Sequence, residues 1–143
     1  MNEEEKRIEE LRLRKNAFTR HNFIELEYVV PDEAAYRLEI RPESYNPYGM
    51  VHGGALYTLA DDAAGGAAHS DGRYYVTQTG TLHFLRNAPA GTLRAVGRVR
   101  HRGKSTCLIE VEITGGDGAL MATGEFTFFC VDKAVMDRRA QGA

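Results

Sequence analysis

A single stretch of helical periodicity, Gly54 to His69, constrains the fold more than any other feature of the sequence. Its apolar residues recur at helical spacing, and most of them are alanine, so this helix can lie very close to its neighbours. The rest of the chain is largely strand-like. A sheet must therefore wrap around the helix, since nothing else in the chain can cover its apolar stripe. We expect an α+β fold built on one central helix.

The strand-like segments alternate apolar and polar residues and are separated by turn-forming residues. Two precede the helix and four follow it: Phe23–Val30, Ala35–Ile40, Tyr74–Leu85, Thr92–His101, Thr106–Thr114 and Ala119–Val131. This order predicts an antiparallel sheet. One edge or face of a sheet of this size stays open, and association with further copies is the usual remedy. We therefore expect a homo-oligomer.

The chain fits a single domain that spans residues 1–143. Residues 2–17 carry a thin apolar stripe among charged residues and predict a helix, so we assign residues 1–20 to an N-terminal helix or arm. The polar residues 133–143 are expected to form a loose tail.

Composition narrows the classes of function. Net charge is −2 and charged residues make up 27% of the chain, so nothing calls for a nucleic acid or a membrane surface. No apolar run approaches the ~18 residues of a membrane span, and the charged N-terminus lacks the apolar core of a signal peptide. Two cysteines are too few for a disulfide scaffold. We expect a cytoplasmic protein.

His52-Gly53-Gly54 stands directly before the predicted helix. Glycine lets a backbone approach a ligand closely, and the first N–H groups of a helix point outward with partial positive charge. Such groups can stabilise the negative oxygen that forms when a carbonyl is attacked. The alternative is that the two glycines only make a tight turn into the helix.

Asp61 and Asp62 lie two turns into the otherwise apolar helix, where aspartate is a poor helix former. Both lie off the apolar stripe, about equally far to either side, so periodicity does not choose between them. They are either solvated acids on an exposed face or, if the sheet wraps the helix, carboxylates that must be paired or functional.

Two further patterns in the sequence bear on metal and phosphate binding. Histidines 52, 69, 83 and 101 are separated by 17, 14 and 18 residues, which fits no metal-ligand motif, and we expect no metal. The segment RHRGKS ends like a phosphate-binding loop, but Arg98 stands where the full pattern needs glycine, and the setting is strand-turn-strand. This basic turn either holds the phosphates of a bulky leaving group or is an ordinary solvated hairpin.

The segment NPYGMVHGGALYTLADDAAG resembles the signature of the hotdog-fold acyl-CoA thioesterases, specifically the PaaI-like branch associated with phenylacetate degradation. The resemblance continues through VTQTGTLHFLRNAPAG and RHRGKSTC and covers roughly Phe23 to Val131. It implies a curved antiparallel sheet wrapped around one long helix. It also implies dimers that share one continuous sheet and pair into tetramers, with the active site at the dimer interface.

The resemblance also implies roles for residues of the helix junction. Gly54 supplies the backbone N–H to the thioester oxygen, while His52 and Asn46 orient the carbonyl or the water. Asp61 is the catalytic carboxylate, acting on substrate held by the other subunit, and Thr77 helps to bind the attacking water. Thr77 also fits an ordinary strand residue. Asp61 acts either as a general base or as a nucleophile through an anhydride, and the sequence does not distinguish the two.

The implied substrate is an acyl-CoA thioester, with coenzyme A as part of the substrate and no separate cofactor. Substrate binding is expected from Gly53, Tyr57, Arg86, Arg102, Gly103 and Lys104. The aromatic side chains of Tyr45, Tyr48, Tyr57 and Phe84 suggest room for an aromatic or medium-length acyl group.

Two alternatives accompany this interpretation. A hotdog enoyl-thioester hydratase needs aspartate and histidine where this chain has Ser44 and Gly49. A non-catalytic hotdog domain would only bind acyl thioesters, and Asp61 argues against it because mere binding needs no carboxylate beside the carbonyl.

Overall fold

The computed structural model describes residues 2, 3 and 16–142 of the chain. The helix predicted over residues 2–17 therefore lies almost entirely outside the described residues. The first described helix is α2, which spans Ala17–His21. The side chain of Asn16 caps α2 by accepting a hydrogen bond from the N–H of Thr19 at 3.2 Å.

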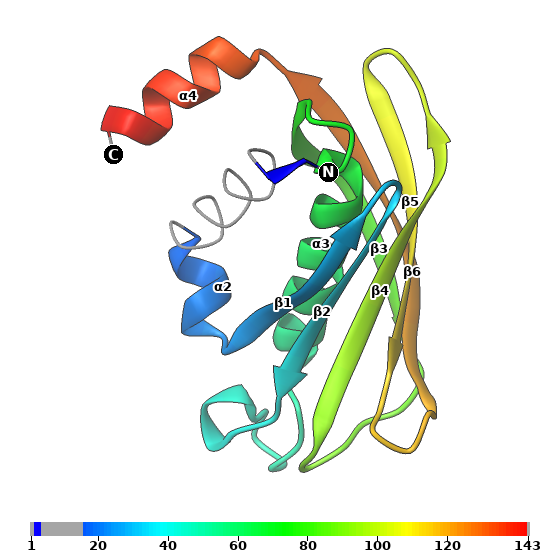
Figure 1. Ribbon diagram of the computed structural model, residues 1–143. Coiled ribbons are helices and arrows are strands. Elements are labelled where there is room, and N and C mark those ends of the chain that lie inside the picture. The colour runs from blue at the N-terminus through cyan, green and yellow to red at the C-terminus, as the bar shows by residue number, and fades with distance from the viewer. Residues whose placement is uncertain (1, 4–15, 143) are drawn as a thin grey trace.

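One long helix and a single six-stranded antiparallel sheet make up the body of the protein, as the sequence predicted (Figure 1). The sheet order is β1-β2-β4-β5-β6-β3. Its strands are β1 (Ile24–Val30), β2 (Glu33–Glu39), β3 (Tyr74–Phe84), β4 (Thr92–Arg102), β5 (Thr106–Thr114) and β6 (Leu120–Val131), and the helix is α3 (Gly53–His69). The predicted segments agree with these bounds to within two residues at each end. The predicted α+β class is confirmed.

Small residues let α3 lie directly against the sheet. Ala60, Ala63 and Ala64 are fully buried. A Cβ placed on Gly97 of β4 would lie 2.6 Å from the carbonyl oxygen of Ala63, so the strand meets the backbone of the helix and not its side chains. Phe126 of β6 is also fully buried and fills the core beside the helix. The alanine-rich stripe therefore serves close packing.

The two edges of the sheet are β1 and β3. Apolar side chains are exposed on and beside β3: Val76 and Phe84 on the strand are 46% and 53% exposed, and Phe129 on the neighbouring β6 is 44% exposed. An unpaired edge flanked by exposed apolar side chains is a surface that proteins commonly cover by pairing with another chain.

Within residues 133–143, which the sequence predicted to form a loose tail, Lys133–Gly142 forms helix α4. Asp132 begins this helix by accepting a hydrogen bond from the N–H of Val135 at 3.0 Å. Tyr74 of β3 holds the helix by donating its hydroxyl to Asp137 at 2.6 Å. The long-range contact with Tyr74 is not visible in the polar composition of the tail. Within the described residues, no helix is long and apolar enough to cross a bilayer.

Candidate active site

The start of α3 is capped by His52, whose Nδ1 accepts a hydrogen bond from the N–H of Gly54 at 2.7 Å. This bond requires Nδ1 to be unprotonated, so a neutral His52 carries its proton on Nε2. The side chain is exposed, which leaves the Nε2–H able to donate. Among the described residues, the N–H of Gly53 has no hydrogen-bond acceptor. The junction therefore presents Gly53, and not Gly54, as its free backbone donor.

The loop before the helix is organised around Asn46. Its side-chain oxygen accepts hydrogen bonds from the N–H groups of Tyr48 at 2.8 Å and Met50 at 3.2 Å. Its backbone N–H also donates to the carbonyl of Met50 at 2.7 Å, and Gly49 supplies the left-handed conformation of the turn with φ +74°. These bonds fix the orientation of the amide, whose Nδ2 has no acceptor in the described part of the chain.

Asp61 and Thr77 are brought together by the packing of α3 on β3. The hydroxyl of Thr77 donates to Oδ1 of Asp61 at 2.8 Å. Burial raises the pKa of Asp61 above its ordinary value, and the hydrogen bond from Thr77 offsets part of that rise by favouring the ionised form. The carboxylate is thus held in place by a group that can also bind water.

Asp62 has a partner that the sequence did not suggest. The hydroxyl of Thr19, on α2, donates to Oδ2 of Asp62 at 2.8 Å. Burial raises the pKa of Asp62 to about 7; the hydrogen bond from Thr19 opposes the rise and the charge of Asp61 adds to it. Two adjacent acids on a largely buried helix were the only sequence signal for this contact, since Thr19 is distant in sequence.

A cavity of about 290 Å³ opens beside these two carboxylates. Its walls combine the acids with aromatic, histidine and glycine residues from α3, β2, β3 and β6, together with the residue that caps α2. The lining residues are Asn16, Tyr36, Asp61, Asp62, Gly65, Gly66, His69, Tyr75, Val76, Thr77 and Phe128. The cavity thus combines aromatic rings with two carboxylates, one of them beside a hydroxyl, and such a mixture of apolar walls and a few polar groups is suited to holding the reacting end of an acyl group.

A larger hollow of about 490 Å³ lies on the outer face of β3, β5 and β6. Threonine and glutamate side chains line most of it, and it contains none of the groups assigned to chemistry. We therefore place the candidate site at the smaller cavity.

The two halves of the predicted site are far apart within one chain. Gly53 and Asp61 are separated by eight residues of helix, or about 12 Å at the ~1.5 Å rise of an α-helix. A carbonyl oxygen hydrogen-bonded to Gly53 therefore lies out of reach of the Asp61 side chain of the same chain.

The basic turn between β4 and β5 differs from the expected phosphate-binding surface. Arg102 points inward: its guanidinium donates to the carbonyls of Ala67 and Ala68 at 3.1 and 2.9 Å, and it pairs with Asp32 at 2.8 Å and Asp71 at 2.9 Å. It thereby satisfies the last carbonyls of α3. The expectation that Arg102 contacts a substrate conflicts with these partners, which assign it to the helix end.

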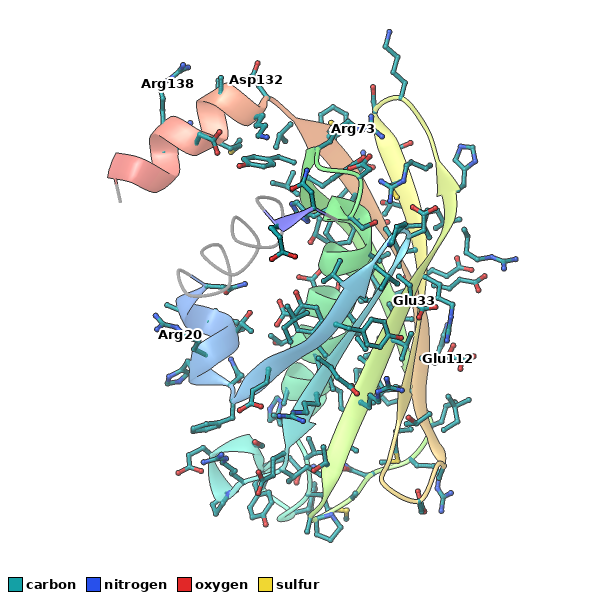
Figure 2. The ribbon with its side chains drawn as sticks, in the orientation of Figure 1. Arg20, Glu33, Arg73, Glu112, Asp132 and Arg138 are labelled. Atoms are coloured by element: carbon teal, nitrogen blue, oxygen red, sulfur yellow. The ribbon has the colours of Figure 1, made fainter. Side chains whose placement is uncertain are left out.

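The backbone of the residues that follow Arg102 is hydrogen-bonded, whereas two cationic side chains stay exposed. Arg73 (Figure 2) follows the end of α3 and donates to the carbonyls of Gly103 at 3.3 Å and Lys104 at 2.8 Å. These bonds hold the turn between β4 and β5 beside the C-terminal end of α3. The side chains of Lys104 and Arg86 are exposed, so these two cations stay accessible to an anionic ligand.

The aromatic residues suggested for the acyl group lie outside the cavity. Tyr57 packs against Phe126 with ring centroids 5.3 Å apart, and Phe84, Tyr45 and Tyr48 are exposed. The aromatic lining of the cavity comes instead from Tyr36, Tyr75 and Phe128, which were predicted only as parts of strands.

His69 is held by two hydrogen bonds to backbone groups. Nδ1 of His69 lies 2.6 Å from the carbonyl oxygen of Gly65, and Nε2 accepts from the N–H of Tyr75 at 3.2 Å. No group of three or more histidine, cysteine, aspartate or glutamate side chains in the described part of the chain could hold a metal ion.

Comparison with protein families gives a match to the thioesterase superfamily over residues 48–122, which include His52, Asp61 and Thr77. The chain is 38% identical over 81 residues to the acyl-coenzyme A thioesterase PaaI of Escherichia coli, a match that covers 56% of this chain and 58% of that protein. It is 32% identical over 108 residues to a 1,4-dihydroxy-2-naphthoyl-CoA hydrolase of Listeria monocytogenes, covering 73% and 87% of the two chains.

Solved structures agree with these sequence matches. The structure of E. coli PaaI superposes with a TM-score of 0.85 at 26% identity, covering 90% of this chain and 94% of that chain. A thioesterase from Streptococcus pneumoniae, solved with coenzyme A, superposes with a TM-score of 0.72 at 29% identity and covers 76% of this chain and 88% of its own. The predicted hotdog fold and PaaI-like resemblance are confirmed.

Proposed function

The chain belongs to the thioesterase superfamily, and on that premise we propose that it hydrolyses acyl-CoA thioesters at a site completed by a second subunit. The observation that carries the proposal is the Asp61–Thr77 pair at 2.8 Å, beside an acyl-sized cavity. A carboxylate that lines such a cavity and is held by a hydroxyl can activate a water molecule as a general base.

We propose that the thioester oxygen is received by the free N–H of Gly53 together with the Nε2–H of His52. This revises the assignment to Gly54, because the N–H of Gly54 is already bound to His52 at 2.7 Å. The side-chain NH₂ of Asn46 supplies a further oriented donor. Several donors directed at one oxygen stabilise the charge that develops there in the transition state.

In the proposed reaction, Asp61 and Thr77 hold a water molecule that attacks the thioester carbon. Asp61 takes a proton from this water as the C–O bond forms. The tetrahedral intermediate then expels the coenzyme A thiolate, which receives the proton from Asp61. Its products are the free acid and coenzyme A, with no further cofactor.

The ~12 Å that separates Gly53 from Asp61 along α3 supports the proposed contribution of a second subunit. Both groups can act on one carbonyl only if they come from different chains. The free edge of β3, with Val76 and Phe84 exposed, offers a place for two copies to pair antiparallel about a two-fold axis. Thr77 lies on this strand, so pairing there brings the second chain next to Asp61.

Binding of the coenzyme A portion is assigned to the exposed cations Lys104 and Arg86. The S. pneumoniae relative was solved with coenzyme A, which supports the same leaving group here. Hydratase activity has less support, because Ser44 and Gly49 stand where that chemistry needs an acid and a histidine.

The proposal is tested by measuring thiol release from a panel of acyl-CoAs with wild-type protein and with Asp61→Asn. Loss of a positioned general base lowers kcat by roughly 10²- to 10⁴-fold, and we expect a loss in this range. If wild type and Asp61→Asn release thiol equally slowly, the proposed thioesterase activity is refuted. Tight acyl-CoA binding without turnover would then identify a binding domain.

The shared site has its own test, in which Gly53→Pro removes the proposed donor. Proline suits the first position of a helix, and the preceding His52 already has the extended ψ of 139° that proline requires of its neighbour. Gly53→Pro and Asp61→Asn are each expected to be inactive. When equal amounts of the two variants are unfolded together and refolded, half of the dimers should contain one chain of each variant. In each such hybrid, one of the two sites combines an unchanged Gly53 with an unchanged Asp61. About a quarter of wild-type activity should therefore return. No recovery, despite hybrid formation shown by mass spectrometry, would contradict the shared site.

A further inference from the structure

The two edges of the sheet differ in how well they are protected from pairing with another chain. The edge strand β1 is seven residues long and carries Glu25 and Glu27, whereas the eleven residues of β3 include no aspartate, glutamate, lysine or arginine. Charged side chains are a common device that keeps an exposed edge from pairing. The edge of β3 lacks that device, and its apolar residues Val76 and Phe84 are exposed. It is therefore the edge suited to pairing.

Tyr57 of α3 and Gly80 of β3 fix the place where the central helix meets this edge. The Tyr57 hydroxyl lies so close to Gly80 that a Cβ on this glycine would collide with it, and the same Cβ would lie 2.7 Å from the ring of Phe126. The Tyr57 ring packs on Phe126 with the ring centroids 5.3 Å apart. Tyr57 is nevertheless 36% exposed. It is thus held over the middle of β3 while part of its side chain still faces outward.

Tyr57 also lies midway between the two halves of the proposed site. It follows Gly53 by four residues and precedes Asp61 by four. Residues four apart in a helix are neighbours on one face, and they are about 6 Å apart along the helix axis. Gly53, Tyr57 and Asp61 therefore follow one another along the same side of α3.

A two-fold axis turns this spacing into a fixed arrangement of two helices. When two copies of one chain pair about such an axis, every contact occurs twice with the roles of the chains exchanged. If Gly53 lies opposite the partner subunit's Asp61, then Asp61 lies opposite the partner subunit's Gly53. The two α3 helices then run antiparallel, and Tyr57, at the midpoint, lies opposite the partner subunit's Tyr57. Because Gly80 lies against Tyr57, the axis also passes close to Gly80.

We propose that a second copy of this chain pairs with β3 in a single register, with the two-fold axis at Gly80 and the Tyr57 side chains of both subunits next to each other at the axis. This inference rests on the proposed function, because the shared site sets the alignment of the two helices. The two tyrosines then lie between the two sites of the dimer. Tyr57 is a positioning residue, since it sets the alignment that brings Gly53 of one chain to Asp61 of the other.

The register can be read on the outer face of the sheet, away from the site. Thr79 and Thr81 flank Gly80, and both line the hollow on that face. With Gly80 at the axis, Thr79 lies directly opposite the partner subunit's Thr81, where Cβ atoms are about 4.5–5.5 Å apart, whereas two copies of the same threonine lie diagonally at about 7–8 Å. The bulge of β3 lies between Thr77 and Thr79, so it leaves this central pair unchanged.

The first test is disulfide formation between cysteines at these two positions. Thr79→Cys and Thr81→Cys are refolded separately and as an equal mixture, and are then oxidised. The mixture should form covalent dimers about tenfold or more faster than either variant alone, because a disulfide needs Cβ atoms about 3.5–4.5 Å apart. Wild type, with its own Cys107 and Cys130, gives the background. Faster cross-linking of either variant alone would indicate another register and overturn the proposal, as would a mixture that does not cross-link or a wild type that sediments as a monomer.

The second test places charges at the axis. Tyr57→Glu and Tyr57→Lys each bring like charges together, so each should raise the dissociation constant of the dimer about tenfold or more. An equal mixture of the two should recover much of the wild-type association, because glutamate then faces lysine. Thr58→Glu and Thr58→Lys, one residue along α3, are the matched controls, and mixing them should give no recovery. No recovery for the Tyr57 pair, with thermal unfolding showing both variants folded, would contradict the placement of Tyr57 at the axis.

These outcomes are separate from the outcome for activity. Cross-linking in the expected register by a protein that hydrolyses no acyl-CoA would refute the proposed function and leave the register standing. An active enzyme that cross-links in a different register would refute the register alone.

Discussion

The hydrogen bond between Thr77 and Asp61 should be visible in the pH dependence of the enzyme. Burial raises the pKa of Asp61, and the bond from Thr77 counteracts it. Since the proposed base acts in its ionised form, kcat/KM should rise with pH as Asp61 loses its proton. Thr77→Val removes the counteracting bond, so the pKa of Asp61 rises further and the acid limb of the profile moves to higher pH.

The size of this effect follows from the 2.8 Å contact. A hydrogen bond to a charged group contributes about 1.5–3 kcal/mol. At the low end of that range, losing the bond reduces the ionised fraction on the acid limb slightly more than tenfold, because about 1.4 kcal/mol corresponds to a factor of ten. We therefore expect kcat/KM of Thr77→Val to be about tenfold below wild type on the acid limb, with a smaller deficit on the plateau.

The assay is a pH profile of kcat/KM with one acyl-CoA, together with an NMR titration of the Asp61 carboxyl carbon that does not depend on turnover. Thr79→Val is the matched control on the same strand, because the Thr79 hydroxyl lies 2.6 Å from that of Thr127 and not from Asp61. An acid limb that stays in place in Thr77→Val, or one that moves equally in Thr79→Val, would refute the reasoning.

Three further outcomes are expected. Burial raises the pKa of Asp62 from 3.8 to about 7, so the folded state keeps a proton that the unfolded state loses, and stability falls as pH rises through this interval. Because each pKa unit corresponds to about 1.4 kcal/mol, Asp62→Asn should be more stable than wild type by as much as about 4 kcal/mol at pH 8 and nearly equal to it at pH 4 in urea unfolding. A difference independent of pH would contradict this. Gly97→Ala places a Cβ 2.6 Å from the Ala63 carbonyl oxygen and should lower the free energy of unfolding by about 1–3 kcal/mol, whereas Gly116→Ala, whose nearest neighbour is at 4.0 Å, should change it by less than about 0.5 kcal/mol. A single turnover in H₂¹⁸O should place the label in the acid product if Asp61 acts as a base, whereas label found in Asp61 by mass spectrometry would establish attack through an anhydride.

The sheet and the central helix could be predicted because local patterns determine them. Period-two alternation marks β5 at the bounds the structure gives, Thr106–Thr114, and the alanine-rich stripe marks α3. A strand that alternates must bury one face, and in the described part of the chain α3 is the long helix that packs against that face. Local pattern and global packing agree here, which is the condition under which sequence-based prediction succeeds.

The site was only partly predictable, since side-chain partners depend on contacts between distant residues. The sequence singled out Asp61 and Thr77 but not the distance of 2.8 Å between their oxygens. The family resemblance placed Arg102 within reach of coenzyme A, whereas the fold directs its guanidinium to the end of α3. Neither the helical pattern nor the family resemblance indicated a partner for Asp62, and that partner, Thr19, is 43 residues away.

The rigid course of α3 between Gly53 and Asp61 has a consequence for how this sequence can change. Each residue of a helix turns the next side chain by about 100°. One inserted or deleted residue between the two positions would rotate Asp61 away from Thr77 and out of the cavity, while the N-terminal donors stayed where they are. This segment can therefore exchange one small side chain for another, but its length of eight steps cannot vary without separating the acid from its hydroxyl partner.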